Sequence, residues 1–114
     1  MSEENCLFCK IISGKIPGEF VHQDDQCVVL RDINPQAPMH VLVIPRDHIE
    51  SLDEASQKEE SLLGHLLRIG ARVANEQEHD SYRTVINTGA GAGQSVFHLH
   101  VHILAGRPMN WPPG

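Results

Sequence analysis

Three features are scarce in this sequence: positive charge, long hydrophobic runs and cysteine. Nine Lys and Arg residues stand against fifteen Asp and Glu residues, so the formal net charge is −6. An acidic chain without a basic cluster is unsuited to bind a nucleic-acid backbone or an anionic membrane. No apolar run approaches the roughly eighteen residues of a membrane span, and the N-terminus lacks the basic region and hydrophobic core of a signal peptide.

Three cysteines cannot form a full set of disulfides, which fits a reducing compartment. We therefore expect a cytoplasmic protein. The chain also lacks internal repeats and a linker, and 114 residues can bury roughly 65% of the unfolded surface but cannot form two cores. We expect one domain over residues 1–114, in which residues 105–114, with three prolines, form an extended tail.

Histidine, in contrast, is concentrated in one segment. Apolar and polar residues alternate over residues 97–104, which predicts a β-strand with His98, His100 and His102 on one face, roughly 6–7 Å apart. Three readings compete: coincidence, a metal site to which His40 or Asp32 adds a ligand, and attack of an imidazole on phosphorus. Three histidines in register make coincidence the weakest, but the strand alone does not choose between the other two.

The remaining pattern predicts two helices and four further strands. Residues 6–13 are expected to form a short helix that Gly14 and Pro17 end. Ser56 and Glu59 form a capping box before one long helix, whose apolar residues recur at helical spacing. The other strands are expected at residues 19–23, 27–31, 40–44 and 82–88. This pattern favours an α+β fold with a five-stranded, mainly antiparallel sheet.

Four motifs resemble those of the histidine triad (HIT) family. Residues 98–104 fit its His-φ-His-φ-His-φ-φ pattern, where φ is apolar, and residues 87–95 look like its phosphate-binding loop. Residues 31–45 are similar to its nucleoside-binding strand pair, and residues 106–114 to the C-terminus of its Hint branch, the purine nucleoside phosphoramidases. The resemblance covers nearly the whole chain from about Cys6. It implies the HIT fold and a homodimer in which two protomers join their sheets.

The resemblance also implies a reaction. In the family the central histidine attacks phosphorus, which maps to His100; His102 contacts the phosphate or the leaving group, and His40 lies close by. The implied activity is hydrolysis of the P–N or a related bond in purine nucleoside monophosphate conjugates, through a nucleotidyl-histidine. No catalytic metal is expected. Without the resemblance, His40 could equally be a half-buried histidine bonded to the backbone.

A nucleotide-binding set follows from the same resemblance. Asp32 would accept hydrogen bonds from the two ribose hydroxyls, although an aspartate after a strand usually caps a turn. The glycines of residues 87–95 let the backbone approach an anion, without the Gly-Lys-Ser/Thr of a Walker loop. The other matching positions are Leu7, Phe8, Leu30, Ile33, Leu42, Asn87, Gly93, Ser95, His100 and His102. The apolar ones would otherwise be assigned to the core.

Cys6 and Cys9 form a CxxC motif at the start of the short helix. Such a pair can be a redox pair, half of a zinc site or two buried thiols. Zinc-containing HIT members combine a CxxC with two histidines, which map to His48 and His98. A closed site of this kind would tie the helix to the sheet and leave the catalytic histidines free, so we expect zinc in a structural role.

Several residues and the reaction itself permit more than one interpretation. Trp111 could simply anchor the tail, whereas in the Hint branch the tail reaches the partner's active site and influences the leaving group. No function is predicted for Gln94, for His65, expected on the surface, or for Cys27, expected as an inert buried thiol. The alternatives are a dinucleoside polyphosphate hydrolase or nucleotidyl transferase, a nucleotide-binding regulatory module with little turnover, and a catalytic metal centre.

Overall fold

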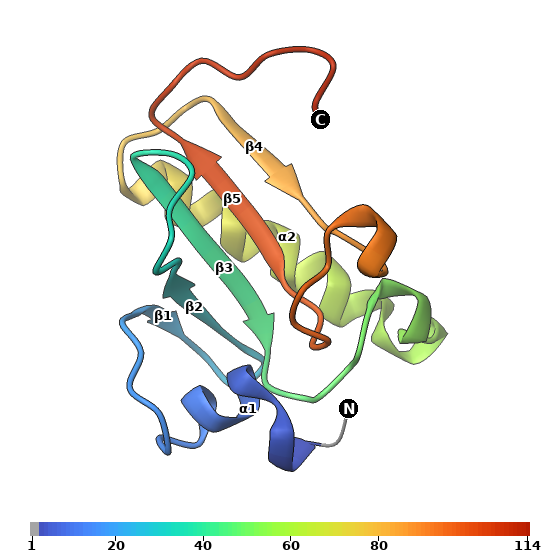
Figure 1. The fold of residues 1–114 in the computed structure, drawn as a ribbon. Helices are drawn as coiled ribbons and strands as arrows, with labels where there is room; N and C mark the ends of the chain where they lie inside the picture. Colours follow the sequence, from blue (N-terminus) through green and yellow to red (C-terminus); the bar gives the residue numbers. More distant parts are fainter. Residues whose placement is uncertain (1–2) are drawn as a thin grey trace.

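The computed structural model describes residues 3–114 and contains one five-stranded sheet with helices on both faces (Figure 1). The strands pair in the order β1-β2-β3-β5-β4, and every pair is antiparallel. This confirms the expected α+β class, with one short and one long helix. The elements are η1 (Glu3–Asn5), α1 (Leu7–Ile12), β1 (Phe20–Gln23), β2 (Cys27–Arg31), β3 (Met39–Pro45), η2 (Leu52–Glu54), η3 (Gln57–Glu59), α2 (Glu60–Glu76), β4 (Tyr82–Val85), η4 (Ala90–Ala92) and β5 (Val101–Ala105).

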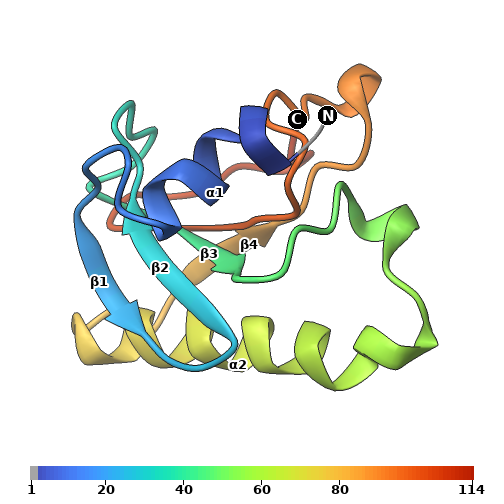
Figure 2. The same cartoon turned by 90° about the horizontal axis from the view of Figure 1, so that it is seen from below.

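Alternation along the central strands sends side chains to two separate cores. One core packs the sheet against α2, and the other packs it against α1, which lies on the opposite face (Figure 2). The α2 side includes Cys27, Val29, Val41, Val43, Val101, Ile103, Leu66, Ile69 and Val73. The α1 side includes Cys6, Phe8, Val28, Leu30, Leu42 and Ile44. Because Leu42 stands opposite His102 in the β3–β5 register, His102 belongs to the α1 side of the sheet.

The long helix begins after the expected capping box, and the short helix ends before Gly14, as the sequence predicts. Ser56 and Glu59 form the expected capping box, which starts the η3 turn that leads directly into α2. Cys6 is the N-cap of α1, and its Sγ accepts a hydrogen bond from the Cys9 N–H. Gly14 follows α1 with a φ of +86°, a conformation that residues with a Cβ rarely adopt. This short helix therefore places two thiols at its first turn, beside the sheet.

The strand expected over residues 97–104 is shorter than the alternation indicates. β5 begins only at Val101, so His102 is the one triad histidine within it. Continuing the β3–β5 register beyond Val43–Val101 brings Pro45 opposite Leu99. Proline has no N–H to donate, and the Leu99 N–H instead bonds to the Ile49 carbonyl, 2.6 Å away. The sheet ladder therefore ends there, and the chain before it is free to turn His98 toward α1.

β4 is also shorter than the expected residues 82–88. It ends at Val85, which pairs with His102. In the same register Ile86 stands opposite Val101, the first residue of β5, so β5 offers no partner to the chain beyond Ile86. The chain then enters the glycine-rich segment, and residues 86–89 have no regular secondary structure. The position at which β5 begins thus determines where β4 ends and the glycine-rich loop starts.

The C-terminal residues cross one end of the sheet (Figure 1). Ala105 still belongs to β5, and residues 106–114 contain no helix or strand. The Arg83 Nη2 group donates to the Asn110 carbonyl, which ties this segment to β4. Within residues 3–114, no helix is long and apolar enough to cross a membrane.

Candidate functional site

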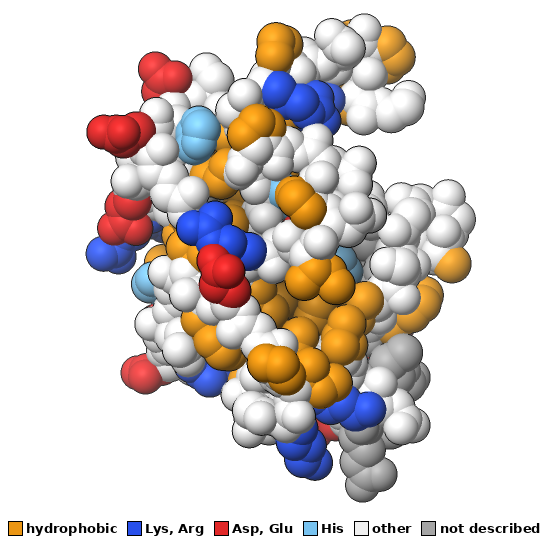
Figure 3. Space-filling model, turned by 60° about the vertical axis from the view of Figure 1, so that its left-hand side comes forward, with side chains coloured by type: hydrophobic (Ala, Val, Ile, Leu, Met, Phe, Trp, Pro, Cys, Tyr) orange, Lys and Arg blue, Asp and Glu red, His pale blue; other side chains and the backbone are white. Residues whose placement is uncertain are grey.

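A cavity of about 340 Å³ opens on the α1 side of the sheet. Hydrophobic side chains gather around a hollow on this flank of the molecule (Figure 3). Most of the predicted nucleotide-binding set lines the cavity: Leu7, Phe8, Leu30, Asp32, Ile33, Leu42, Ser95, His100 and His102. The volume and the largely apolar walls suit a small planar ligand with a few polar groups.

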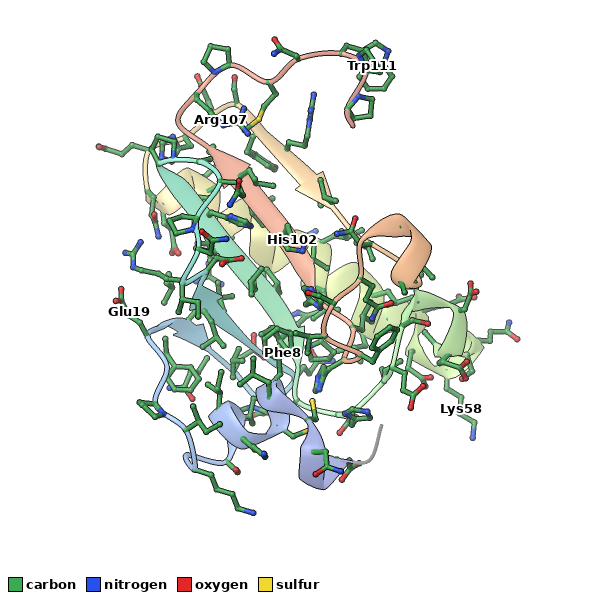
Figure 4. The ribbon with its side chains drawn as sticks, viewed as in Figure 1. Phe8, Glu19, Lys58, His102, Arg107 and Trp111 are labelled. Carbon is green, nitrogen blue, oxygen red and sulfur yellow. The ribbon has the colours of Figure 1, made fainter. Side chains whose placement is uncertain are left out.

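Four predicted residues do not line this cavity. His40 is buried behind His102. Asn87 and Gly93 lie together in the glycine-rich loop, where a Cβ on Gly93 would stand 3.7 Å from the Asn87 amide nitrogen. Trp111 is 83% exposed and lies at the edge of the molecule, away from Phe8 and His102 (Figure 4). Ile33 lines the rim only, since its side chain is fully exposed.

The hydrogen bonds around His100 determine which ring nitrogen carries the proton. His100 Nδ1 lies 2.7 Å from the backbone carbonyl of His98, which can only accept. The proton is therefore on Nδ1, and Nε2 has a free lone pair. His100 also lines the cavity and packs edge-on against the Phe8 ring. A lone pair held in this way is what a nucleophile requires.

The same reasoning extends from His40 to His102. The Gln36 backbone N–H donates to His40 Nδ1 at 3.0 Å, so His40 carries its proton on Nε2. His40 Nε2 lies 2.9 Å from His102 Nδ1 and donates to it. His102 therefore keeps its own proton on Nε2. These hydrogen bonds leave His100 Nε2 as an acceptor and His102 Nε2 as a donor. The centroids of the two rings are 5.0 Å apart.

Burial keeps these imidazoles neutral. Burial first, and then the electrostatic influence of His100 and His40, lower the pKa of His102 to about 4, against the opposing influence of Asp32. Burial also lowers the pKa of His100 and of His40, against the opposing influence of Asp32. A neutral His100 retains the lone pair that an imidazolium would lose.

Asp32 serves a turn and faces the histidines at the same time. Its Oδ1 accepts the Asn34 N–H at 2.8 Å, which is the turn-capping role that its position suggests. Its Oδ2 lies 3.4 Å from His40 Nε2, and the side chain lines the cavity. One carboxylate oxygen therefore remains on the cavity side to accept hydrogen bonds from a ligand.

A second cluster joins α1 to the chain before β5. The Sγ atoms of Cys6 and Cys9 and the Nδ1 atoms of His48 and His98 lie within 4.8 Å of one another. The Cys6–His98, Cys9–His48 and Cys9–His98 distances are 3.2, 3.4 and 3.6 Å. Tetrahedral zinc with its usual bond lengths separates a sulfur and a nitrogen ligand by about 3.6 Å. The four residues therefore have the spacing of a Cys₂His₂ zinc site.

The protonation of the histidine rings and thiols in this cluster also favours the binding of a cation. His98 Nε2 donates to the Pro45 carbonyl at 2.8 Å, which leaves the Nδ1 lone pair directed at the two thiols. His48 Nε2 is buried and is the single buried side-chain nitrogen or oxygen atom without a hydrogen-bond partner in the described part of the chain. Burial, then the neighbouring Cys6, raises the pKa of Cys9 to about 12, so a cation is needed to form its thiolate.

Comparisons with known proteins agree with the fold and the site described above. A family model described as "Scavenger mRNA decapping enzyme C-term binding" matches residues 5–111. An uncharacterized HIT-like protein of Synechococcus elongatus is 51% identical over 112 residues, which cover 97% of this chain and 98% of that protein. The chain belongs to the histidine triad family.

Two further relatives show what HIT proteins of this kind look like. The crystal structure of a HIT family hydrolase from Legionella pneumophila matches with a TM-score of 0.93 at 43% identity, over 96% of this chain and 100% of that one. A 14 kDa zinc-binding protein of Zea mays is 44% identical over 117 residues, which cover all of this chain and 91% of that protein. The fold described above is therefore that of a HIT family hydrolase.

Sequence reasoning missed several residues of this HIT site. The cavity is also lined by Ile11, Ile16, Pro17, Arg31 and Val96. Ile11 could have been found, because it follows Leu7 by four residues and so shares its face of α1. The loop residues Ile16 and Pro17 gave no such signal, since no periodicity relates them to the pocket.

Gln94 is the most informative omission. Its side chain is only 3% exposed and its Oε1 accepts the Gly89 N–H at 2.9 Å. Its Nε2 donates to the carbonyls of Glu50 and Val96, at 2.7 and 3.1 Å. One amide thus fastens both ends of the glycine-rich loop and joins them to the segment after β3.

Replacing Gln94 by leucine is expected to lower the free energy of unfolding by about 2–4 kcal/mol. The change leaves a backbone N–H and two carbonyls without their partner in a partly buried place. Urea denaturation measures the loss, and Gln57→Leu, at an exposed position, is the matched control. A loss below about 1 kcal/mol for Gln94→Leu would show that the amide does not hold the loop.

Proposed function

We propose that this protein hydrolyses the P–N, or a related, bond of purine nucleoside 5′-phosphoramidates and releases the nucleoside monophosphate. The observation that carries the proposal is the pair of opposite groups in the cavity: a lone pair on His100 Nε2 and an N–H on His102 Nε2. The family membership and the HIT hydrolase fold support it.

The reaction divides into two displacements at phosphorus. His100 Nε2 forms a bond to phosphorus as the P–N bond breaks, and the leaving amine takes up a proton from water. The ring of the nucleotidyl-histidine is then positively charged, and its Nδ1–H bond to the His98 carbonyl stabilises that charge. Water next breaks the histidine–phosphorus bond, which releases the nucleotide and restores the neutral ring. His102 Nε2 donates to a phosphoryl oxygen throughout.

The cavity supplies a place for each part of a nucleotide. The base lies between apolar side chains of α1, β2 and β3, namely Leu7, Phe8, Leu30 and Leu42, with Ile33 at the rim. Asp32 Oδ2 accepts hydrogen bonds from the ribose hydroxyls, since Oδ1 is occupied by its turn. Ser95, which lines the cavity, binds the phosphate, and Asn87 and Gly93, which lie outside the cavity in the same loop, are proposed to bind the leaving-group side.

Zinc in this protein has a structural role. Cys6, Cys9, His48 and His98 would hold it, as their spacing and proton positions fit, and the zinc-binding maize relative supports this. When bound, zinc would favour the thiolate forms and cross-link α1 to the sheet. The residues proposed for catalysis lie outside that ligand set.

The protein forms a homodimer in the cytoplasm. β4 is an edge strand, so its outer side can pair with the same strand of a second copy. Cys6, Cys9 and Cys27 are all free, which fits a reducing compartment.

The test is turnover of adenosine 5′-phosphoramidate by the untagged protein with EDTA present throughout. We expect release of AMP and, in single turnovers quenched with alkali, which preserves a histidine–phosphorus bond, a chain carrying one AMP on His100 by mass spectrometry. Binding of AMP without turnover would favour a regulatory module. Loss of activity on addition of EDTA, at a temperature where the chelated protein stays folded, would favour a catalytic metal. A dinucleoside polyphosphate assayed in parallel, if cleaved faster, would place the protein with those hydrolases.

Removal of residues 110–114 is expected to change the preference among leaving groups by about tenfold or more. The proposed role of Trp111 is to reach the partner's active site, where it limits the leaving group. The kcat/KM values for three phosphoramidates with small, aliphatic and aromatic amines measure this. The Arg83–Asn110 hydrogen bond that the truncation removes is exposed, so the unfolding temperature should change little, and equal relative rates before and after truncation would contradict the proposal.

A further inference from the structure

Metal-ligating side chains converge at a second place, where the β1–β2 turn meets α2 (Figure 2). His22 of β1, Asp24 of the turn and Cys27 of β2 offer ligand atoms that all lie within 4.8 Å of one another. His65 of α2 adds its Nε2, 2.8 Å from Asp24 Oδ2. We call these four residues the Asp24 cluster. Cys27 packs on the α2 side of the sheet, whereas Cys6 packs on the α1 side, so the two clusters are separate.

The Asp24 carboxylate has more hydrogen-bond donors than it can accept. Its Oδ1 takes the backbone N–H groups of Gln26 and Cys27, both at 2.8 Å. Its Oδ2 faces three donors: His22 Nε2 at 2.9 Å, His65 Nε2 at 2.8 Å and Cys27 Sγ at 3.5 Å. A carboxylate offers about four lone-pair positions, two on each oxygen. Five donors therefore compete for four positions, and the excess lies at Oδ2.

We propose that the Asp24 cluster binds a divalent cation of the zinc class, with His22, Asp24, Cys27 and His65 as its ligands. A cation resolves the crowding, because the imidazoles and the thiolate then present lone pairs to it in place of protons. Two imidazoles, a carboxylate and a thiolate form a mixed N, O and S set that suits zinc better than magnesium or calcium.

The ligand atoms of His22, Asp24 and Cys27 already lie close enough together to share an ion, whereas His65 Nε2 lies outside this group and must move closer to the others. Tetrahedral zinc separates a thiolate and a carboxylate ligand by about 3.5 Å, which is the Cys27–Asp24 distance. The two histidine nitrogens would move away from Oδ2 by about 0.5 Å to reach the nitrogen–oxygen separation of the same geometry. Neither His22 nor His65 has a partner at Nδ1 among residues 3–114, so each ring can move its proton there. The thiol proton of Cys27 passes to solvent.

Access and charge permit an ion to enter. The side chains of His22, Asp24 and His65 are 21, 26 and 29% exposed, and Cys27 forms the buried floor. A bound thiolate and carboxylate together balance a divalent charge. The nearby Arg46 cation is held by the Asp24 backbone carbonyl and by the Gln23 side chain, and so occupies none of the ligand atoms.

The experiment measures zinc stoichiometry in the untagged full chain. Protein stripped with EDTA is equilibrated with buffered Zn²⁺, and the bound metal is counted by plasma mass spectrometry. The variant with Cys6→Ser and Cys9→Ser should still bind about one equivalent, and its unfolding temperature should rise by at least about 4 °C with zinc. Adding His22→Asn should reduce binding to less than a tenth of an equivalent. With Co²⁺ as the probe, Cys27→Ser should remove the thiolate charge-transfer band.

Two comparisons keep the result decisive. His79→Asn, a histidine outside both clusters, should leave the stoichiometry unchanged and so excludes adventitious surface binding. If the Cys6 and Cys9 variant does not fold, His22→Asn is made in the otherwise native chain, where bound zinc should fall by about one equivalent. The proposal is overturned if the folded double variant binds less than a tenth of an equivalent, or if His22→Asn changes nothing. The Asp24 cluster is then a hydrogen-bonded link between the turn and α2.

Discussion

Replacement of His100 by alanine is expected to lower kcat for adenosine 5′-phosphoramidate by at least ~10³-fold. The change removes the one lone pair that both faces the cavity and lies on a ring whose other nitrogen is fixed by a carbonyl. Without it, water must attack phosphorus directly, and the reaction loses its covalent intermediate. Steady-state and single-turnover kinetics, with EDTA present, measure the loss.

The His100→Ala variant must be shown to be a folded protein that still binds its ligand. Its dissociation constant for AMP should stay within about tenfold of the native value, because the apolar walls and Asp32 remain. His79→Ala, which changes a histidine outside the cavity, should leave kcat unchanged. A His100→Ala variant that retains more than a tenth of the native kcat would contradict nucleophilic catalysis by this residue.

Alternation in the sequence located the histidines but not the end of the strand. It correctly puts His102 on one face of β5, opposite Leu42. It could not show that β5 begins only at Val101, because the cause lies in Pro45, more than fifty residues earlier in the chain. A strand pattern describes one chain segment, whereas a ladder needs a partner with an N–H to donate.

The orientation of the imidazoles lies equally beyond a sequence pattern. The tautomers of His40 and His100 depend on two backbone groups, the Gln36 N–H and the His98 carbonyl, whose positions are set by the fold. His65 was expected on the surface from its helix alone, yet it bonds to Asp24 across 41 residues of sequence. Motif spacing identifies residues with the side chains that a reaction or a metal requires. Only the tertiary structure shows which of them are in contact.

Removal of zinc is expected to lower the unfolding temperature by roughly 10–15 °C. A ligand present at 100 to 1,000 times its dissociation constant stabilises the native state by about 2.7–4.1 kcal/mol. In a domain of this size each kcal/mol shifts the unfolding temperature by about 4 °C. Cys9→Ser should produce the larger part of this shift without chelator, since it removes a ligand near both His48 and His98 but leaves the Asp24 cluster intact. Thermal unfolding followed by circular dichroism measures both.

Two comparisons separate this effect from other causes. Lys10→Ser introduces the same residue next to Cys9 on α1 and should shift the unfolding temperature by less than about 3 °C, because Lys10 belongs to neither metal cluster. Below the unfolding transition, Cys9→Ser should keep kcat within about tenfold of native, since Cys9 does not line the nucleotide cavity. A variant that stays stable but loses turnover would instead mean that the metal takes part in the chemistry. Stability lost together with zinc, while catalysis survives, is the combination that a purely structural metal requires.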